Sequence, residues 1–178
     1  MEKDGFKVKD IGLVICTHSH PDHFEAVKSV VEQSSALLAL SREEDEFYNN
    51  TGNYFYNAFG SQLPEIKPFF YLKEGDLSLG ATNKLAIKVL LTPGHTPGSI
   101  SLYLQEAKIL MSGDVIFSGS VGRTDFPGGS ASLLRESINK LSQLDAEYLV
   151  PGHSTEAGSI IASKGKVSRN FHLVKMFI

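Results

Sequence analysis

The first forty residues alternate between apolar and polar blocks of strand or helix length. Residues 11–17 form a short, β-branched apolar run, which predicts a buried strand. In residues 24–33 the apolar positions Phe24, Val27, Val30 and Val31 are spaced by three, three and one, as in a helix packed on one side. Residues 36–40 predict a second buried strand. The chain therefore opens as strand, loop, helix and strand.

The pattern weakens in the middle of the chain. Ser41 is expected to cap a helix over residues 41–48, because Glu44 stands three positions later. The acidic run 43–46 is interpreted as the first turn and solvated face of that helix. Residues 49–68 have no clear period, and we interpret them as an insertion or lid-like segment. Their aromatic side chains are expected either to line a substrate cleft or to form a small hydrophobic cluster, namely Tyr54, Phe55, Tyr56 and Phe59.

In the C-terminal half the apolar runs 85–91, 99–104 and 107–111 predict strands. Residues 130–144 predict a helix with one apolar face, and residues 148–150 predict a last strand.

Four of the apolar runs end in a short polar turn that carries a histidine or an aspartate. The runs 13–16, 89–91, 109–111 and 149–150 lead to His18, His95, Asp114 and His153, respectively. In layered α/β proteins, ligands bind at the carboxyl ends of strands along one edge of a sheet. The four segments are therefore predicted to converge.

The first of these turns holds most of the candidate metal chemistry. On an extended backbone His18 and His20 point to the same side. Pro21 prevents a regular helix across the cluster, so that Asp22 and His23 can face a second point. Imidazole and carboxylate are normal ligands for zinc, and also for iron or manganese. A strand followed by this spacing is a specific indication of a metal site.

The other three candidates depend on one another. Taken singly, His95 and His153 are read equally well as loop histidines, and Asp114 as a turn residue. Five of the six histidines fall in strand-end turns, however, and this repetition favours a shared site. The sixth, His172, is expected to be a non-ligating surface or packing residue.

Seven donors suit two divalent ions better than one. The ions are expected to be zinc, with iron or manganese as alternatives. Two cations lower the pKa of a shared water, and one of them can polarise a carbonyl. Asp22 and Asp114 would orient that water. The expected partition gives His18, His20 and His95 to the first metal, Asp22, His23 and His153 to the second, and makes Asp114 the bridge.

These motifs, in this order, resemble the metallo-β-lactamase superfamily. The matching segments are residues 18–23, 94–98, 112–114 and 151–153. The resemblance implies an α/β fold, an αββα sandwich with the metals at one edge of two sheets, in a single domain over residues 1–178. Only 17 residues precede His18. The N-terminal part of the first sheet is therefore expected to be shortened.

Within the superfamily, residues 119–129 resemble the corresponding segment of short hydroxyacylglutathione hydrolases, which are glyoxalase II-like enzymes, and in part that of persulfide dioxygenases. The resemblance implies that Arg123 binds substrate. The alternative is an internal ion pair with Asp125, and the two roles are compatible at different times.

The resemblance implies a thioester hydrolase that uses a metal-bound hydroxide as nucleophile on a small, glutathione-derived substrate. One alternative is a mononuclear iron persulfide dioxygenase that would use His18, His20, His95 and Asp114. A second alternative is a truncated, non-catalytic remnant that still binds metal.

Composition and charge argue against nucleic acid and membranes as binding partners. A formal net charge of −3 and a pI near 6.1 supply no broad basic surface for nucleic acid. No apolar run approaches the ~20 residues that span a bilayer, and the polar N-terminus does not read as a signal peptide. The single cysteine, Cys16, is expected to be a small buried residue. We expect a cytoplasmic protein, and an exposed sheet edge would favour a homo-oligomer.

Overall fold

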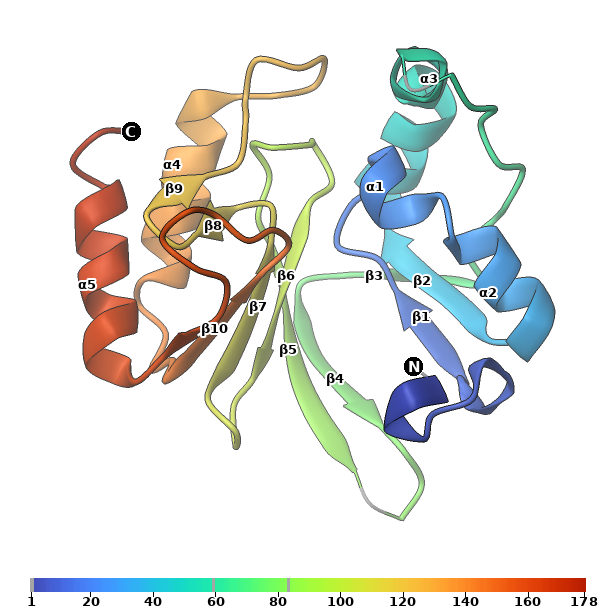
Figure 1. Ribbon diagram of the computed structural model, residues 1–178, viewed down its shortest axis with the longest axis horizontal. Coiled ribbons are helices and arrows are strands. Elements are labelled where there is room, and N and C mark those ends of the chain that lie inside the picture. The colour runs from blue at the N-terminus through green and yellow to red at the C-terminus, as the bar shows by residue number, and fades with distance from the viewer. Residues whose placement is uncertain (1, 59, 83) are drawn as a thin grey trace. The chain divides into compact units, whose positions relative to one another are not determined.

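The computed structural model describes residues 2–58, 60–82 and 84–178, so Phe59 lies outside the described residues. The chain divides into two compact units, residues 1–72 and residues 73–178. Figure 1 shows the elements of each unit.

The first unit is built on a parallel sheet with the strand order β1-β2-β3. Its strands are β1 (Leu13–Ile15), β2 (Leu37–Ser41) and β3 (Phe70–Leu72). Parallel neighbours need crossover connections, and helices supply them. The helices are α1 (Pro21–Phe24) and α2 (Val27–Ser34) between β1 and β2, and α3 (Arg42–Ala58) between β2 and β3. Two short 3-10 helices, η1 (Glu2–Asp4) and η2 (Val8–Asp10), precede β1.

The predicted strand, helix and strand at the start of the chain are confirmed, with one refinement. The helix expected over residues 24–33 is two helices, because α1 ends at Phe24 and α2 begins at Val27. Phe24 and Val27 are both buried against β2 residues Leu38 and Leu40 in one hydrophobic cluster. Cys16 belongs to the same cluster, as expected for a small buried residue.

The prediction for residues 49–68 is wrong over its first half. Helix α3 continues through this segment to Ala58. Its buried positions, counted from Glu44, recur at three, four, eight, eleven and twelve residues, which is a helical period. Asn, Gly and aromatic residues are weak helix formers, so composition concealed this period. Phe55 and Tyr56 are buried, whereas Tyr54 is exposed, so this part of the chain contributes mainly to the core of the unit.

The second unit holds a six-stranded sheet with the order β11-β10-β7-β6-β5-β4. Its strands are β4 (Gly75–Leu79), β5 (Leu85–Leu91), β6 (Ile100–Leu104), β7 (Ile109–Gly113), β10 (Tyr148–Pro151) and β11 (Ile161–Ala162). A hairpin of β8 (Ile116–Phe117) and β9 (Ser120–Val121) follows β7. The helices are α4 (Ala131–Leu141), capped by Ser130, and α5 (Lys164–Val174).

Strand direction decides which loops of this sheet share an edge. β10 is parallel to β7, whereas β6 is antiparallel to both β7 and β5. β5, β7 and β10 therefore run the same way, and the loops that follow them leave the same edge of the sheet. The predicted convergence of strand ends is confirmed for these three strands.

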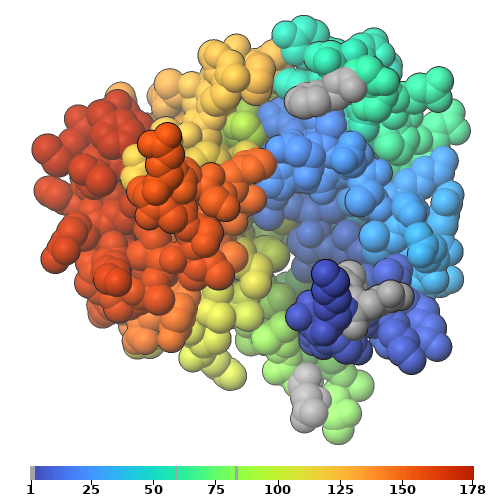
Figure 2. Space-filling model, in the orientation of Figure 1, coloured from blue at the N-terminus to red at the C-terminus, as the bar shows by residue number. Residues whose placement is uncertain are grey.

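One face of the second unit is covered by α4 and α5. Ile138 and Leu141 of α4 and Phe171 of α5 pack in one cluster with Leu110 of β7 and Leu149 of β10. The cluster explains why α4 has a single apolar face. The sequence did not predict α5, which lies at the surface in Figure 2 and leaves Leu173 49% exposed.

Candidate metal centre

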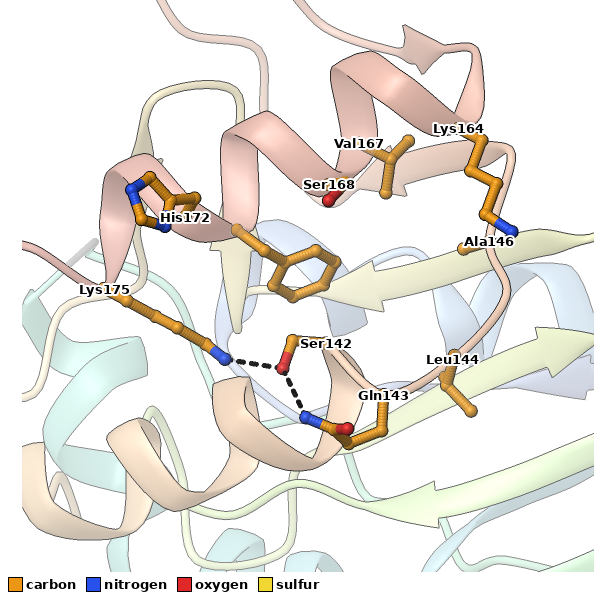
Figure 3. Close-up of a pocket in the computed structure, with 10 residues that line it drawn as sticks. Ser142, Gln143, Leu144, Ala146, Lys164, Val167, Ser168, His172 and Lys175 are labelled. Atoms are coloured by element: carbon orange, nitrogen blue, oxygen red, sulfur yellow. Dashed lines mark hydrogen bonds between the residues drawn. The ribbon is translucent and has the colours of Figure 1, made fainter.

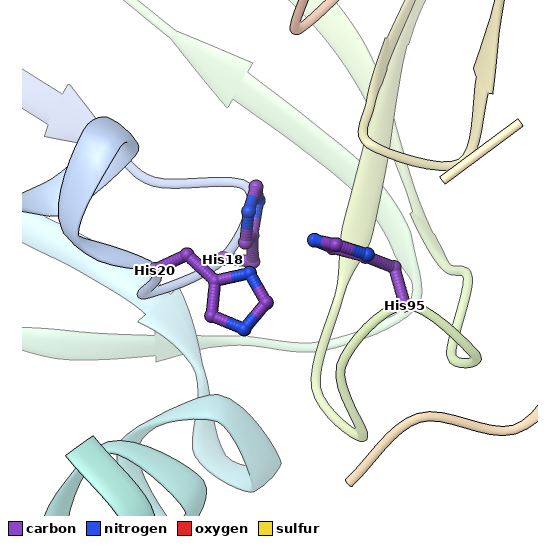
Figure 4. A group of neighbouring side chains, drawn as sticks. All are labelled: His18, His20 and His95. Carbon is purple, nitrogen blue, oxygen red and sulfur yellow. The ribbon is translucent and has the colours of Figure 1, made fainter. Parts of the chain in front are cut away.

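In the first unit, β1 leads into a short loop that carries His18 and His20, both buried. Figure 4 shows both side chains on this loop. Their ring centroids lie 5.0 Å apart, and the ring of His23 lies 4.1 Å from that of His18. Oδ2 of Asp22 is 3.7 Å from Nε2 of His23. The four donors predicted from residues 18–23 therefore cluster.

The expected role of Pro21 needs a correction. The sequence predicts that Pro21 excludes a helix across the cluster and presets a turn. Instead it is the first residue of α1, a position where its missing N–H costs nothing, so Asp22 and His23 lie on one helical turn. His18 and His20 precede that turn in non-helical backbone, as predicted.

Glu44 differs from its predicted role. The sequence predicts that it belongs to a capping box and to a solvated acidic face. Its backbone N–H does donate to Ser41 Oγ at 3.1 Å, which confirms the cap. Its carboxylate, however, is fully buried and accepts hydrogen bonds from the backbone N–H and the hydroxyl of Ser19, each at 2.7 Å. The helical spacing of Phe47 and Tyr48 after Glu44 could have indicated that it faces inward.

In the second unit, the three predicted donors lie on three loops at one edge of the sheet. His95 follows β5, Asp114 follows β7, and His153 follows β10. Oδ2 of Asp114 lies 3.2 Å from Nε2 of His153 and 3.6 Å from Nε2 of His95. His95 and Asp114 are buried, whereas the side chain of His153 is 44% exposed. One carboxylate oxygen thus faces two imidazole nitrogens. This is the arrangement expected of a carboxylate ligand that lies between two histidine ligands.

The tautomer of His95 is set by a backbone carbonyl. Nδ1 of His95 donates to the carbonyl oxygen of Arg123 at 2.8 Å, since a carbonyl can only accept. Nε2 therefore keeps its lone pair and faces Asp114, which is the usual arrangement of a metal-ligating histidine. His95 follows Gly94, whose φ of +135° favours glycine, and Figure 4 shows its side chain on the loop between β5 and β6.

Gly122 makes this arrangement sterically feasible. A Cβ atom at this position would lie 1.8 Å from the carbonyl oxygen of Asp114 and 3.3 Å from Nδ1 of His95. Only glycine can occupy a position so close to the backbone of a ligand residue.

Arg123 forms the ion pair that the sequence suggested. Its Nε and Nη2 donate to the two oxygens of Asp125 at 2.9 and 2.6 Å. The guanidinium also lies 4.0 Å from the ring centroid of Phe126. The ion pair lowers the pKa of Asp125 to about 2. Both side chains are more than 60% exposed, so a substrate anion can compete for the guanidinium.

A separate cavity of about 360 Å³ lies between the C-terminal end of α4 and helix α5 (Figure 3). Its two cations are already engaged, since Lys164 pairs with Asp145 at 2.5 Å and Lys175 donates to Ser142 at 2.6 Å. The exposed His172 lines it, in keeping with a non-ligating residue. None of the seven predicted ligands is among the described residues that line this cavity.

Comparison with known proteins identifies the family. The family model for the metallo-β-lactamase superfamily matches residues 1–153. This chain belongs to that superfamily. The α/β fold class predicted from the sequence is thereby confirmed.

Individual relatives agree with this assignment. A probable metallo-hydrolase, YqgX, of Bacillus subtilis is 35% identical and covers 84% of this chain and 73% of its own length. The hydroxyacylglutathione hydrolase GloC of Haemophilus influenzae is 33% identical over 82% of this chain and 70% of its own length. The crystal structure of TTHA1623 in a di-iron-bound form is 31% identical, with a TM-score of 0.72 over 89% of this chain and 75% of that chain.

The family and the chemistry of the donors together indicate the general class of the protein. The chain belongs to a superfamily that includes metallo-hydrolases, and its clustered imidazole and carboxylate donors suit divalent metal ions. Among the described residues no helix is both long and apolar enough to cross a membrane.

Proposed function

We propose that this chain is a thioester hydrolase of the hydroxyacylglutathione type. The observation that carries the proposal is the approach of Asp114 to both His95 and His153 at one sheet edge, in a member of a metallo-hydrolase superfamily. The 33% identity to a hydroxyacylglutathione hydrolase supports a thioester as substrate.

We further propose that the donors of the two units form one dinuclear centre. The ligand set would be the seven residues His18, His20, Asp22, His23, His95, Asp114 and His153. The donor chemistry fits, because His95 presents Nε2 as an acceptor and the Asp114 carboxylate faces two imidazoles. Two divalent metals bound there would polarise the substrate carbonyl and generate a nucleophile from water near neutral pH.

The protein's own residues would then position the ligands and the substrate and orient the attacking water. Asp114, held between two histidines, would fix the spacing of the ligands, and Asp22 would help to orient the attacking water. A thiolate is a good leaving group, so no side chain is needed as a strong general acid. Arg123 would exchange Asp125 for a carboxylate of the glutathione moiety, because both side chains are exposed.

The metal is proposed to be zinc, and the similarity to a di-iron-bound protein keeps iron as the alternative. The remaining proposals are a small-molecule substrate, no nucleic-acid or membrane partner, a cytoplasmic location and assembly into a homo-oligomer.

The test is the hydrolysis of S-lactoylglutathione and other acyl thioesters by metal-loaded protein, measured as the release of free thiol. His153→Ala should lower kcat/KM by more than about 100-fold if His153 is a ligand, since even outer-shell changes cost about 10- to 100-fold. His172→Ala is the matched control, because it removes another exposed histidine of the same unit, and it should leave the rate unchanged. Absence of thioester cleavage by the loaded protein would refute the proposal.

The mononuclear iron alternative would leave His153 outside the ligand set. His153 lies 3.2 Å from Asp114, which supports its place in the ligand set and therefore the dinuclear hydrolase over the mononuclear alternative. Oxygen uptake on glutathione persulfide with one iron per chain would reverse this preference.

A further inference from the structure

A buried carboxylate lies next to the metal-binding loop of the first unit, and the proposed reaction does not use it. Glu44 is fully buried in the first turns of α3. Burial of a charged group costs several kcal/mol unless hydrogen bonds and nearby charges compensate. Such a residue in a core therefore calls for a structural or functional reason.

Two of the hydrogen bonds that Glu44 accepts come from the residue between two candidate ligands. Oε1 of Glu44 accepts from the backbone N–H and from the hydroxyl of Ser19, both at 2.7 Å. Ser19 itself is 4% exposed and lies between His18 and His20 in the chain. Fixing both the backbone and the side chain of Ser19 restricts the dihedral angles that aim the two imidazoles.

The position of Glu44 is itself fixed by hydrogen bonding. Ser41 caps the backbone N–H of Glu44, so the carboxylate projects from a defined point at the start of α3. On the same helix, the ring of Phe55 lies 4.4 Å from that of His20. Helix α3 thus contacts the loop through a hydrogen-bonded carboxylate and through an aromatic ring.

The carboxylate of Glu44 also lies close to the histidines of the loop, because its Oε1 accepts hydrogen bonds from Ser19, the residue between His18 and His20. A carboxylate in a buried site of low polarity favours a cation bound by those neighbouring histidines.

We propose that Glu44 is a positioning residue for metal binding: through Ser19 it holds His18 and His20 in the ligating geometry, and its buried charge favours the bound cation. The inference rests on the proposed metal centre but not on the choice of a thioester as substrate.

The experiment compares three variants with the unaltered protein. Glu44→Gln keeps an acceptor oxygen but removes the charge, and Ser19→Ala removes only the hydroxyl donor. Tyr48→Phe is the control, because it removes a partly buried hydrogen bond of the same helix, that of the Tyr48 hydroxyl to the Pro64 carbonyl at 2.5 Å, and leaves the hydrogen bonds of Ser19 in place. Two readouts are taken: titration with Co²⁺, followed by its visible absorption spectrum, and amide hydrogen exchange of Ser19 in metal-free protein.

Glu44→Gln should raise the Co²⁺ dissociation constant by about 10- to 100-fold and alter the absorption bands. It should also speed the exchange of the Ser19 amide by about tenfold or more, because a charge-assisted hydrogen bond is lost. Ser19→Ala should move the Co²⁺ affinity in the same direction by less, and it keeps the test decisive if Glu44→Gln does not fold. Tyr48→Phe should lower thermal stability alone.

Unaltered Co²⁺ affinity, spectrum and Ser19 exchange in Glu44→Gln would overturn the inference. An equal loss of Co²⁺ affinity in Tyr48→Phe and in Glu44→Gln would also overturn it, because the effect would then be general destabilisation. The proposed function has a separate readout: a protein that binds Co²⁺ as expected but cleaves no thioester refutes the proposed substrate and leaves the role of Glu44 standing.

Discussion

Oδ2 of Asp114 lies 3.2 Å from Nε2 of His153, although the two residues follow different strands of the six-stranded sheet. The contact arises because β7 and β10 are parallel neighbours, so the loops after them leave the same edge. A carboxylate at this distance from an imidazole, and at 3.6 Å from a second one, makes Asp114 the central residue of the donors in its unit.

Asp114→Asn should therefore impair metal binding more than any change at the surface. The amide keeps the size of the side chain but removes the negative charge that would bridge two cations. We expect the metal content to fall from two ions per chain to one or fewer, and kcat/KM to fall by more than about 100-fold. Asp125→Asn is the control, since it neutralises an exposed carboxylate of the same unit, and elemental analysis of both purified variants checks the difference. Full metal content in Asp114→Asn would argue against a bridging role.

Gly122→Ala should destabilise the second unit. The added methyl group would lie 1.8 Å from the Asp114 carbonyl oxygen, which is backbone and cannot move aside cheaply. We expect a loss of about 3 kcal/mol or more in the free energy of unfolding, measured by urea denaturation. At Gly165 on α5 a Cβ would meet no atom within 4 Å, so Gly165→Ala should stabilise by about 0.5–1 kcal/mol. Equal effects of the two substitutions would contradict this account of Gly122.

The pKa of Cys16 leads to a pH-dependent prediction. Burial, reinforced by Glu44, raises its pKa from 9.0 to about 12, so the thiol stays protonated in the folded chain at pH 9. Because the folded pKa lies above the unfolded one, the contribution of Cys16 to stability is complete below pH 9 and is lost as the pH rises towards 12. Below pH 9, Ellman's reagent should react with the native protein at least about 100-fold more slowly than with the urea-unfolded chain. Equal rates would mean that Cys16 is accessible as thiolate.

Arg123→Met should separate substrate binding from chemistry. The guanidinium is exposed and paired with Asp125, whereas the contact of Arg123 with His95 is made by its backbone carbonyl, which the substitution keeps. If it binds a carboxylate of glutathione, the substitution raises KM for S-lactoylglutathione several-fold, with kcat nearly unchanged. An acyl thioester without glutathione carboxylates is the control substrate, and its KM should not change. An equal rise for both substrates would assign Arg123 a purely structural role.

Features that depend on local sequence patterns and on strand direction could be predicted from the sequence. Strand β5 was predicted with its bounds, Leu85–Leu91, because its apolar run is short and continuous. The clustering of Asp114 with His95 and His153 was predicted because each follows a strand, and strand direction is a simple topological property. These inferences needed no knowledge of side-chain packing.

The inferences that were missed depended on packing. The inward orientation of Glu44 is set by its contact with Ser19, and an acidic run gives no local sign of such a partner. The continuation of α3 to Ala58 is stabilised by burial of Phe55 and Tyr56, which outweighs the poor helix propensity of the surrounding residues. The close approach of Gly122 to Asp114 likewise exists only in three dimensions.

The most direct test of the account is to count the metal ions that restore thioester hydrolysis. Metal-free protein is titrated with Zn²⁺ and, anaerobically, with Fe²⁺, and the hydrolysis of S-lactoylglutathione is measured at each step. The account predicts that activity rises until two equivalents per chain are bound, and that His153→Ala, but not His172→Ala, lowers this number. Full binding at one equivalent, with no hydrolysis and with oxygen uptake on a persulfide, would contradict it.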